Sequence, residues 1–122
     1  MKWWPGRDMP NLRAMGDRAR DALKAYEVAE AVYSEYRKER DALEVRYRSL
    51  IGRWWGEYEA GHLSPMDRYS VERELAAIST GIVELVQPMH HARVALEVAQ
   101  QEIRAVLQAA GFALPPDDLT KL

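Results

Sequence analysis

Two long runs of this chain place a core-type residue after every three and then every four positions. The first run extends from Leu12 to Trp54, and the second extends from Val71 to Ala110. This spacing keeps one stripe of a slightly underwound α-helix facing a partner helix, as the seam of a coiled coil requires. The sequence therefore predicts an all-α fold built from two long helices.

The break between the two runs carries signals for one helix end and one helix start. Gly61 suits the left-handed position just past a helix C-terminus. Ser64, Pro65 and Asp67 then match an N-cap, a first helical residue and an acidic third position. Because only about three residues remain for the connection, the two helices are expected to be antiparallel neighbours.

These signals divide the chain into three parts. Residues 1–10 hold two prolines, a glycine and two tryptophans, and are expected to form an irregular aromatic arm. A long, coiled-coil-like helical hairpin is predicted over residues 11–111, with a helix at 11–60 capped by Asn11, a turn at 61–64 and a helix at 65–110. Pro88 predicts a kink near residues 84–88 of the second helix. Residues 112–122 form the expected C-terminal tail.

Antiparallel pairing of the two runs sets large residues against small ones. Folding the chain at the predicted turn places Tyr26 beside Ala99 and Ala29 beside Leu96. This alternation allows closely packed helices to interdigitate.

The predicted helices carry more apolar residues than one seam can bury. A stripe wider than a two-stranded seam usually faces a third or fourth helix, and the chain has no further segment of that length. We expect a second copy to complete a four-helix bundle by dimerisation, or a different protein to cover the stripe. The apolar residues outside the seam are Leu23, Val28, Val32, Ile51, Trp55 and Tyr58 in the first helix, and Val83, Val86, Val94, Val98 and Leu107 in the second. The expected partner-binding residues are Leu23, Val32, Val83, Val86, Val94 and Val98, together with Trp3 and Trp4 of the arm.

Trp3 and Trp4 have two interpretations. Tryptophan is enriched among the residues that dominate protein interfaces, so the pair could anchor the arm in a partner's pocket. Alternatively, the pair packs at the end of the hairpin beside Phe112 and Leu114.

One layer of the predicted seam contains a charge. Arg40 occupies a seam position, and antiparallel pairing places it near Glu84, His90 and His91. A charge in a seam costs stability but can fix the register or the oligomeric state. We therefore treat these four residues as a candidate polar mid-bundle site, in which Glu44, Glu84 or a partner chain neutralises the arginine.

Composition argues against several functional classes. The chain has no cysteine, and its net charge is −2. We find no phosphate-binding loop, activated nucleophile or acid–base pair, and therefore expect neither an enzyme nor a cofactor. Glu59 and His62 have the spacing of metal ligands, but Gly61 should end the helix between them, so no metal site is predicted. No apolar run approaches the ~20 residues that span a bilayer. The start of the chain lacks the apolar region of a signal peptide, and we expect a cytoplasmic protein.

These observations favour a non-enzymatic protein–protein interaction module. Such a module would serve as a small regulator, adaptor or assembly factor that acts through its helix faces, and as a homodimer. One alternative is a dimeric nucleic-acid-binding regulator that uses helical arginines such as Arg46, Arg48 and Arg53. A further alternative is a metal-binding helical bundle with Glu and His ligands at the dimer interface.

Overall fold

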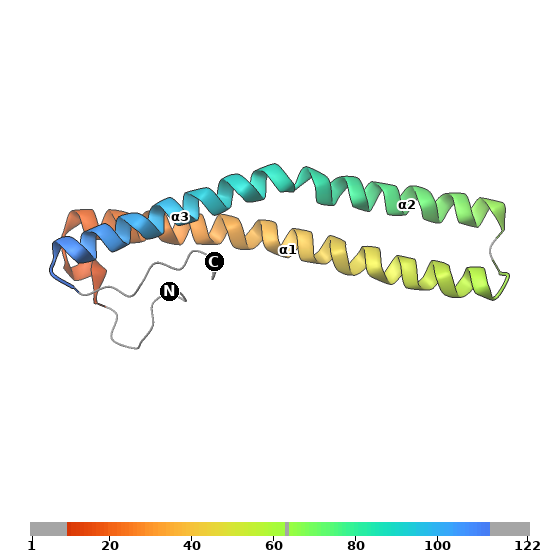
Figure 1. Ribbon diagram of the computed structural model, residues 1–122, viewed down its shortest axis with the longest axis horizontal. Helices are drawn as coiled ribbons and strands as arrows, with labels where there is room; N and C mark the ends of the chain where they lie inside the picture. The colour runs from red at the N-terminus through yellow and green to blue at the C-terminus, as the bar shows by residue number, and fades with distance from the viewer. Residues whose placement is uncertain (1–9, 63, 113–122) are drawn as a thin grey trace. The chain divides into compact units, whose positions relative to one another are not determined.

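The computed structural model describes residues 10–62 and 64–112, and within them the chain is all-α (Figure 1). A 3₁₀ turn, η1 (Leu12–Ala14), precedes three helices: α1 (Asp17–Glu59), α2 (Pro65–Glu84) and α3 (Val86–Ala109). Two long helices of 43 and 45 residues pack antiparallel as a hairpin, the second comprising α2, Leu85 and α3. The predicted all-α hairpin is confirmed. The predicted arm, except for Pro10, and the tail beyond Phe112 lie outside the described residues.

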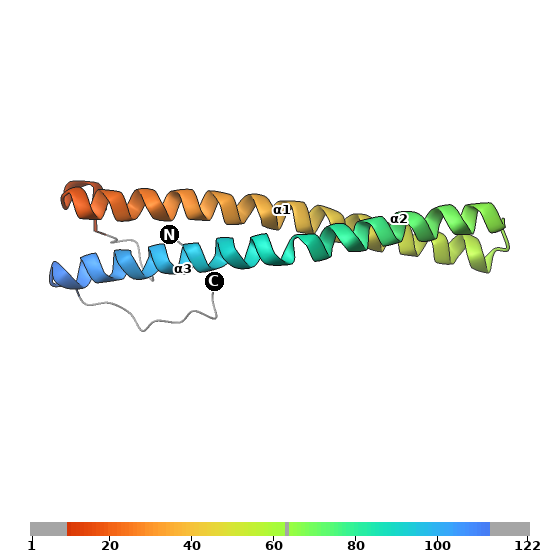
Figure 2. The same cartoon turned by 90° about the horizontal axis from the view of Figure 1, so that it is seen from above.

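The hairpin divides into two compact units, which we describe separately. The terminal unit consists of residues 1–33 and 92–122, and the turn unit consists of residues 34–91. Figure 2 shows α1 beside α3 in the first, and Figures 1 and 2 together show α1 beside α2 in the second. Except for Ala110, which follows the end of α3, every predicted seam residue is buried or half-buried.

Glycine ends two of the helices in the same way. Gly61 has a φ of 70°, and its N–H donates to the carbonyl of Tyr58 while the N–H of His62 donates to that of Glu57. Gly111, with a φ of 89°, makes the equivalent pair of bonds at the end of α3. This arrangement satisfies carbonyls that a helix end leaves without partners, and it needs a residue that tolerates positive φ.

The start of α2 follows the capping pattern read from the sequence. The hydroxyl of Ser64 accepts a hydrogen bond of 3.1 Å from the backbone N–H of Asp67. Pro65 is the first helical residue, where its missing N–H costs nothing.

The second long helix is interrupted at Leu85, within the range where Pro88 predicts a kink. Proline has no N–H to give to the carbonyl of Glu84, so the regular hydrogen-bond series fails there. The N–H of Leu85 donates to the carbonyl of Ile82, three residues earlier, at 3.2 Å, where a regular α-helix bonds to the residue four positions earlier. Figure 1 shows the interruption between α2 and α3.

The first helix begins at Asp17 and not at residue 11, because the chain reverses direction at Gly16. Gly16 has a φ of 113°, and the Asn11 side chain makes no capping hydrogen bond. The preceding segment runs back along α1, where Arg13 forms an ion pair of 3.1 Å with Glu27. Leu12 is buried through this reversal and not as part of the first helix.

η1 completes the core of the terminal unit on one side. Leu12 belongs to the same buried cluster as Leu107, which the sequence placed outside the seam and which is fully buried. The other members of the cluster are Ala19, Ala22, Tyr26, Leu96, Ala99, Ile103 and Val106. The chain therefore covers part of its surplus apolar stripe itself.

The turn unit has a thinner core. Ile78, Leu85 and Met89 are buried in it. Leu43 packs against Gly81, where a Cβ atom would lie 3.4 Å from the nearest methyl group of the leucine. Across residues 10–62 and 64–112, no helix has the length and apolar character needed to cross a membrane.

Gly16→Ala is expected to lower the free energy of unfolding by about 1 kcal/mol, because an L-residue at positive φ is strained. Gly52→Ala is the matched control: Gly52 lies inside α1 with open space around its Cβ position, so alanine should stabilise by up to about 1 kcal/mol. Urea unfolding followed by circular dichroism measures both changes. Equal effects of the two substitutions would contradict the reversal at Gly16.

Candidate functional site

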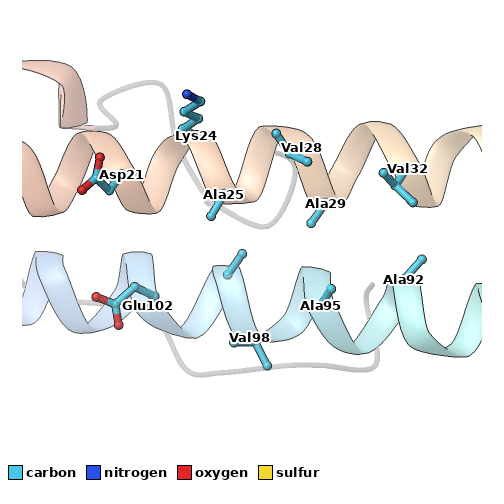
Figure 3. A pocket seen from close by; sticks show the side chains of 11 residues that line it. Asp21, Lys24, Ala25, Val28, Ala29, Val32, Ala92, Ala95, Val98 and Glu102 are labelled. Carbon is cyan, nitrogen blue, oxygen red and sulfur yellow. The ribbon is translucent and has the colours of Figure 1, made fainter.

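An apolar groove of about 860 Å³ lies between α1 and α3 in the terminal unit (Figure 3). Alanine and valine form most of its surface, and charged residues stand at one end. The lining residues are Asp21, Lys24, Ala25, Val28, Ala29 and Val32 from α1, and Ala92, Ala95, Val98, Ala99 and Glu102 from α3.

The groove lies on the flank of the seam that η1 leaves open. At about 100° per residue, Val28 and Val32 project on one side of the α1 seam row, whereas Leu23 and Glu27 project on the other. Leu12 lies with Leu23 and Glu27 along that second side. Among the described residues, η1 closes one flank of the two-helix core, and no segment closes the other.

Small and branched side chains together shape the groove. Ala25 and Ala95 contribute only a methyl group each, which leaves the hollow between the helices. The ridges are valines: Val28 is 57% exposed, Val32 is 44% exposed and Val98 is 63% exposed. Valine has few rotamers to lose, so covering these side chains costs little conformational entropy.

Charge is confined to one end of the groove. Asp21 lies across from Glu102, which accepts a hydrogen bond of 2.9 Å from the guanidinium of Arg18. Figure 3 shows Lys24 pointing away from α3. Because polar groups do not converge along the apolar length, the groove suits the apolar face of a helix better than a small polar substrate. Comparisons of the chain with protein families, curated proteins and solved structures found no match.

The predicted partner-binding residues fall into separate places. Val32 and Val98 line the groove, but Leu23 is half-buried and packs against the core beside η1. Val94 is exposed on α3 outside the groove lining, and Val83 and Val86 are exposed in the turn unit. Trp3 and Trp4 lie outside the described residues.

The groove alanines were missed as site residues by the sequence analysis. Ala25 and Ala29 on α1, and Ala92, Ala95 and Ala99 on α3, recur at intervals of three or four beside the valines. A row of small residues next to a branched row was the available signal, since it leaves a hollow that a helix can enter.

Arg40 of the candidate polar mid-bundle site pairs with carboxylates of its own helix. Arg40 is half-buried, and its guanidinium lies 3.3 Å from a carboxylate oxygen of Asp41 and 3.8 Å from one of Glu44. Its hydrogen bonds and ion pairs in the described part of the chain do not reach Glu84, His90 or His91, which are all exposed. The Nε of Arg40 is buried without a hydrogen-bond partner.

The two histidines lie side by side at the surface of the turn unit. The rings of His90 and His91 have centroids 6.1 Å apart and are inclined by 50°. In the stretches that the structure describes, no three side chains of His, Asp or Glu come together as a ligand set for a metal.

The arginines considered for nucleic-acid binding are each paired with a carboxylate. Arg46 contacts Glu74 at 2.7 Å across the turn unit, and Arg48 contacts Glu44 at 3.7 Å. Arg53 contacts Glu57 at 3.2 Å. These pairs offset the positive charge that a phosphate-binding surface needs.

Aromatic side chains cluster near the end of α1 in the turn unit. Trp54 stacks on Tyr58 with ring centroids 5.4 Å apart, and Trp55 lies 5.7 Å from Trp54. Trp55 and Tyr58 are about half exposed, and the indole N–H of Trp54 is buried without a hydrogen-bond partner. The cluster packs on itself along one helix.

Arg40→Met is expected to raise the free energy of unfolding by about 1 kcal/mol, because it replaces a poorly paired charge in an apolar seam with a side chain of similar length. Arg48→Met is the matched control. Arg48 shares the carboxylate of Glu44, but its side chain is 76% exposed against 37% for Arg40. The control should change stability by less than about 0.5 kcal/mol. Chemical denaturation measures both variants, and a loss of stability in Arg40→Met would show that the charge supports the native pairing.

Proposed function

We propose that this chain is a non-enzymatic protein–protein interaction module that binds through the apolar groove between α1 and α3. The observation that carries the proposal is the groove itself: valine ridges about half exposed over an alanine floor, on the flank of the core that no other described segment covers. Exposed apolar patches of this kind mark sites of protein association.

The shape of the groove favours a helix as the bound element. Its lining extends over residues 21–32 of α1 and 92–102 of α3. At 1.5 Å per residue this is about 16 Å, or three turns of a helix. A helix presenting apolar residues at intervals of three and four would place one residue per turn between the valines. A regulator, adaptor or assembly factor that recognises helices, including those of a second copy, fits this arrangement.

A dimeric nucleic-acid-binding regulator is the less favoured function. Its candidate residues Arg46, Arg48 and Arg53 each have a carboxylate within 3.7 Å. The metal-binding bundle has no ligand set in the described residues to support it.

A photo-cross-linking amino acid at position 98 tests the proposal in cells that naturally produce the chain. Val98 lines the groove, and Val45, the matched control, lies outside it; both side chains are 63% exposed. We expect discrete covalent adducts, seen on gels with an antibody to the chain, from position 98 and not from position 45. Mass spectrometry of the adducts distinguishes a second copy from another protein. Equal labelling from both positions, or none from position 98, would contradict a groove-based interaction.

The nucleic-acid alternative makes a separate prediction. Replacing Arg46, Arg48 and Arg53 together by glutamine should leave the adducts at position 98 unchanged. Binding of the wild-type chain to duplex DNA that weakens steeply with salt, and disappears in the triple variant, would instead favour the alternative.

A further inference from the structure

The two ends of the groove between α1 and α3 differ in charge. Figure 3 shows Asp21 on α1 and Glu102 on α3 at one end, and Val32 and Ala92 at the other. Apart from Lys24, the residues that line the groove between these ends are alanines and valines. An occupant of the groove therefore meets two carboxylates at one end of an otherwise apolar surface, and these carboxylates can set its direction.

Of the two carboxylates, that of Asp21 is free to bind an occupant. Glu102 accepts a hydrogen bond of 2.9 Å from the guanidinium of Arg18, whereas the carboxylate of Asp21 makes no ion pair or hydrogen bond with the side chains that the structure describes. Lys24 is a cation of the lining, but Figure 3 shows its side chain pointing away from α3. The charge directed into this end of the groove is therefore negative.

The length and the charge of the groove together specify the chemistry of its partner. The lining accepts about three turns of a helix whose apolar residues pack between Val28 and Val98. The next turn of such a helix projects a side chain toward Asp21 and Glu102. A lysine or arginine at that position is attracted to the carboxylates and covers the apolar lining with its stem, whereas an aspartate or glutamate is repelled.

A second copy that docked by the same face would not supply this cation. A two-fold interface uses the same patch on both copies. That patch would bring Asp21 and Glu102 again, while its Lys24 points away from the groove. The charge of the groove therefore favours a helix of different sequence over this face of a second copy.

We propose that the groove binds an amphipathic helix of another protein, which carries a lysine or arginine one turn beyond its apolar face, and that Asp21 and Glu102 bind this basic end. This inference rests on the proposed function and states the chemistry of its partner. The Arg18–Glu102 pair is about half exposed and is a weak surface contact, so the carboxylate of Glu102 can be shared with a cation of the partner.

Binding of model peptides to the full chain tests the proposal. Each peptide is an amphipathic helix of about 18 residues with leucines at intervals of three and four. The peptides differ only in the turn at one end, which carries lysines, glutamines or glutamates. Fluorescence anisotropy should give a dissociation constant about tenfold lower for the lysine peptide than for the glutamate peptide at about 0.1 M salt. This preference should disappear near 1 M salt, where charges are screened beyond about 3 Å.

Charge variants of the chain identify the residues that set the preference. Asp21→Lys should reverse it, so that the glutamate peptide binds about tenfold more tightly than the lysine peptide. Glu30→Lys is the matched control, because it makes the same charge change at an exposed position on the η1 flank, and it should alter the preference by less than about twofold. Arg18→Gln should increase the wild-type preference about threefold, because it frees the carboxylate of Glu102.

Two aspartate variants test the apolar part of the groove. Val28→Asp should abolish binding of all three peptides, and Val45→Asp, outside the groove, should leave it unchanged. Circular dichroism checks that every variant keeps its helices.

Three outcomes would overturn this inference: peptides that bind the wild type and Val28→Asp equally, a lysine preference that is absent or that survives Asp21→Lys, and a dimer in light scattering that Val28→Asp dissociates, since a second copy would then occupy the groove. Adducts from position 98 would leave the proposed function standing in each case. Their absence would contradict the proposed function as well.

Discussion

Two helices packed side by side can shelter only the stripe of each that faces the other. In this chain that stripe is narrow, and large side chains alternate with small ones along it. Ala22 and Tyr26 on α1 share one buried cluster with Leu96 and Ala99 on α3. The contact excludes water from the seam but leaves both flanks of each helix in solvent. What happens at those flanks determines what the molecule can bind.

The two flanks of the core differ in the terminal unit. A turn at Gly16 sends the preceding segment back along α1, where Leu12 joins the core and Leu107 becomes fully buried. Within residues 10–62 and 64–112 the opposite flank has no such cover, and Val28 and Val98 remain more than half exposed beside a floor of alanines. An apolar surface that survives folding in this way is available for association, and the charges at its end limit the ways in which a partner can align.

The sequence predicted those features that depend on local chemistry. The seam spacing, the glycine at the end of α1, the Ser64 cap and the interruption near Pro88 follow from backbone hydrogen bonding and side-chain periodicity. The predicted start of the first helix was wrong. Leu12 has the sequence position that the seam spacing requires, but it lies in η1 and not in α1. Periodicity cannot tell whether an apolar residue continues a helix or folds back onto it.

The candidate site was only partly predictable for a related reason. The sequence identified the valines as apolar residues that the seam does not bury. Which of these residues stay exposed depends on where η1 packs, which is a tertiary effect. Leu23 and Val28 have similar sequence surroundings, yet one packs under η1 and the other lines the groove. The grouping of Arg40 with His90 stays a prediction, and the structure shows that Arg40 also has the carboxylates of Asp41 and Glu44 within one turn of its own helix.

The difference between the two flanks can be measured directly, because the chain has no cysteine of its own. Single variants Leu23→Cys and Val28→Cys would be reacted with a maleimide at several protein concentrations. The account predicts slow labelling at position 23 and fast labelling at position 28 in dilute solution. Equal rates at the two positions in dilute solution would contradict a core that is closed on one flank and open on the other.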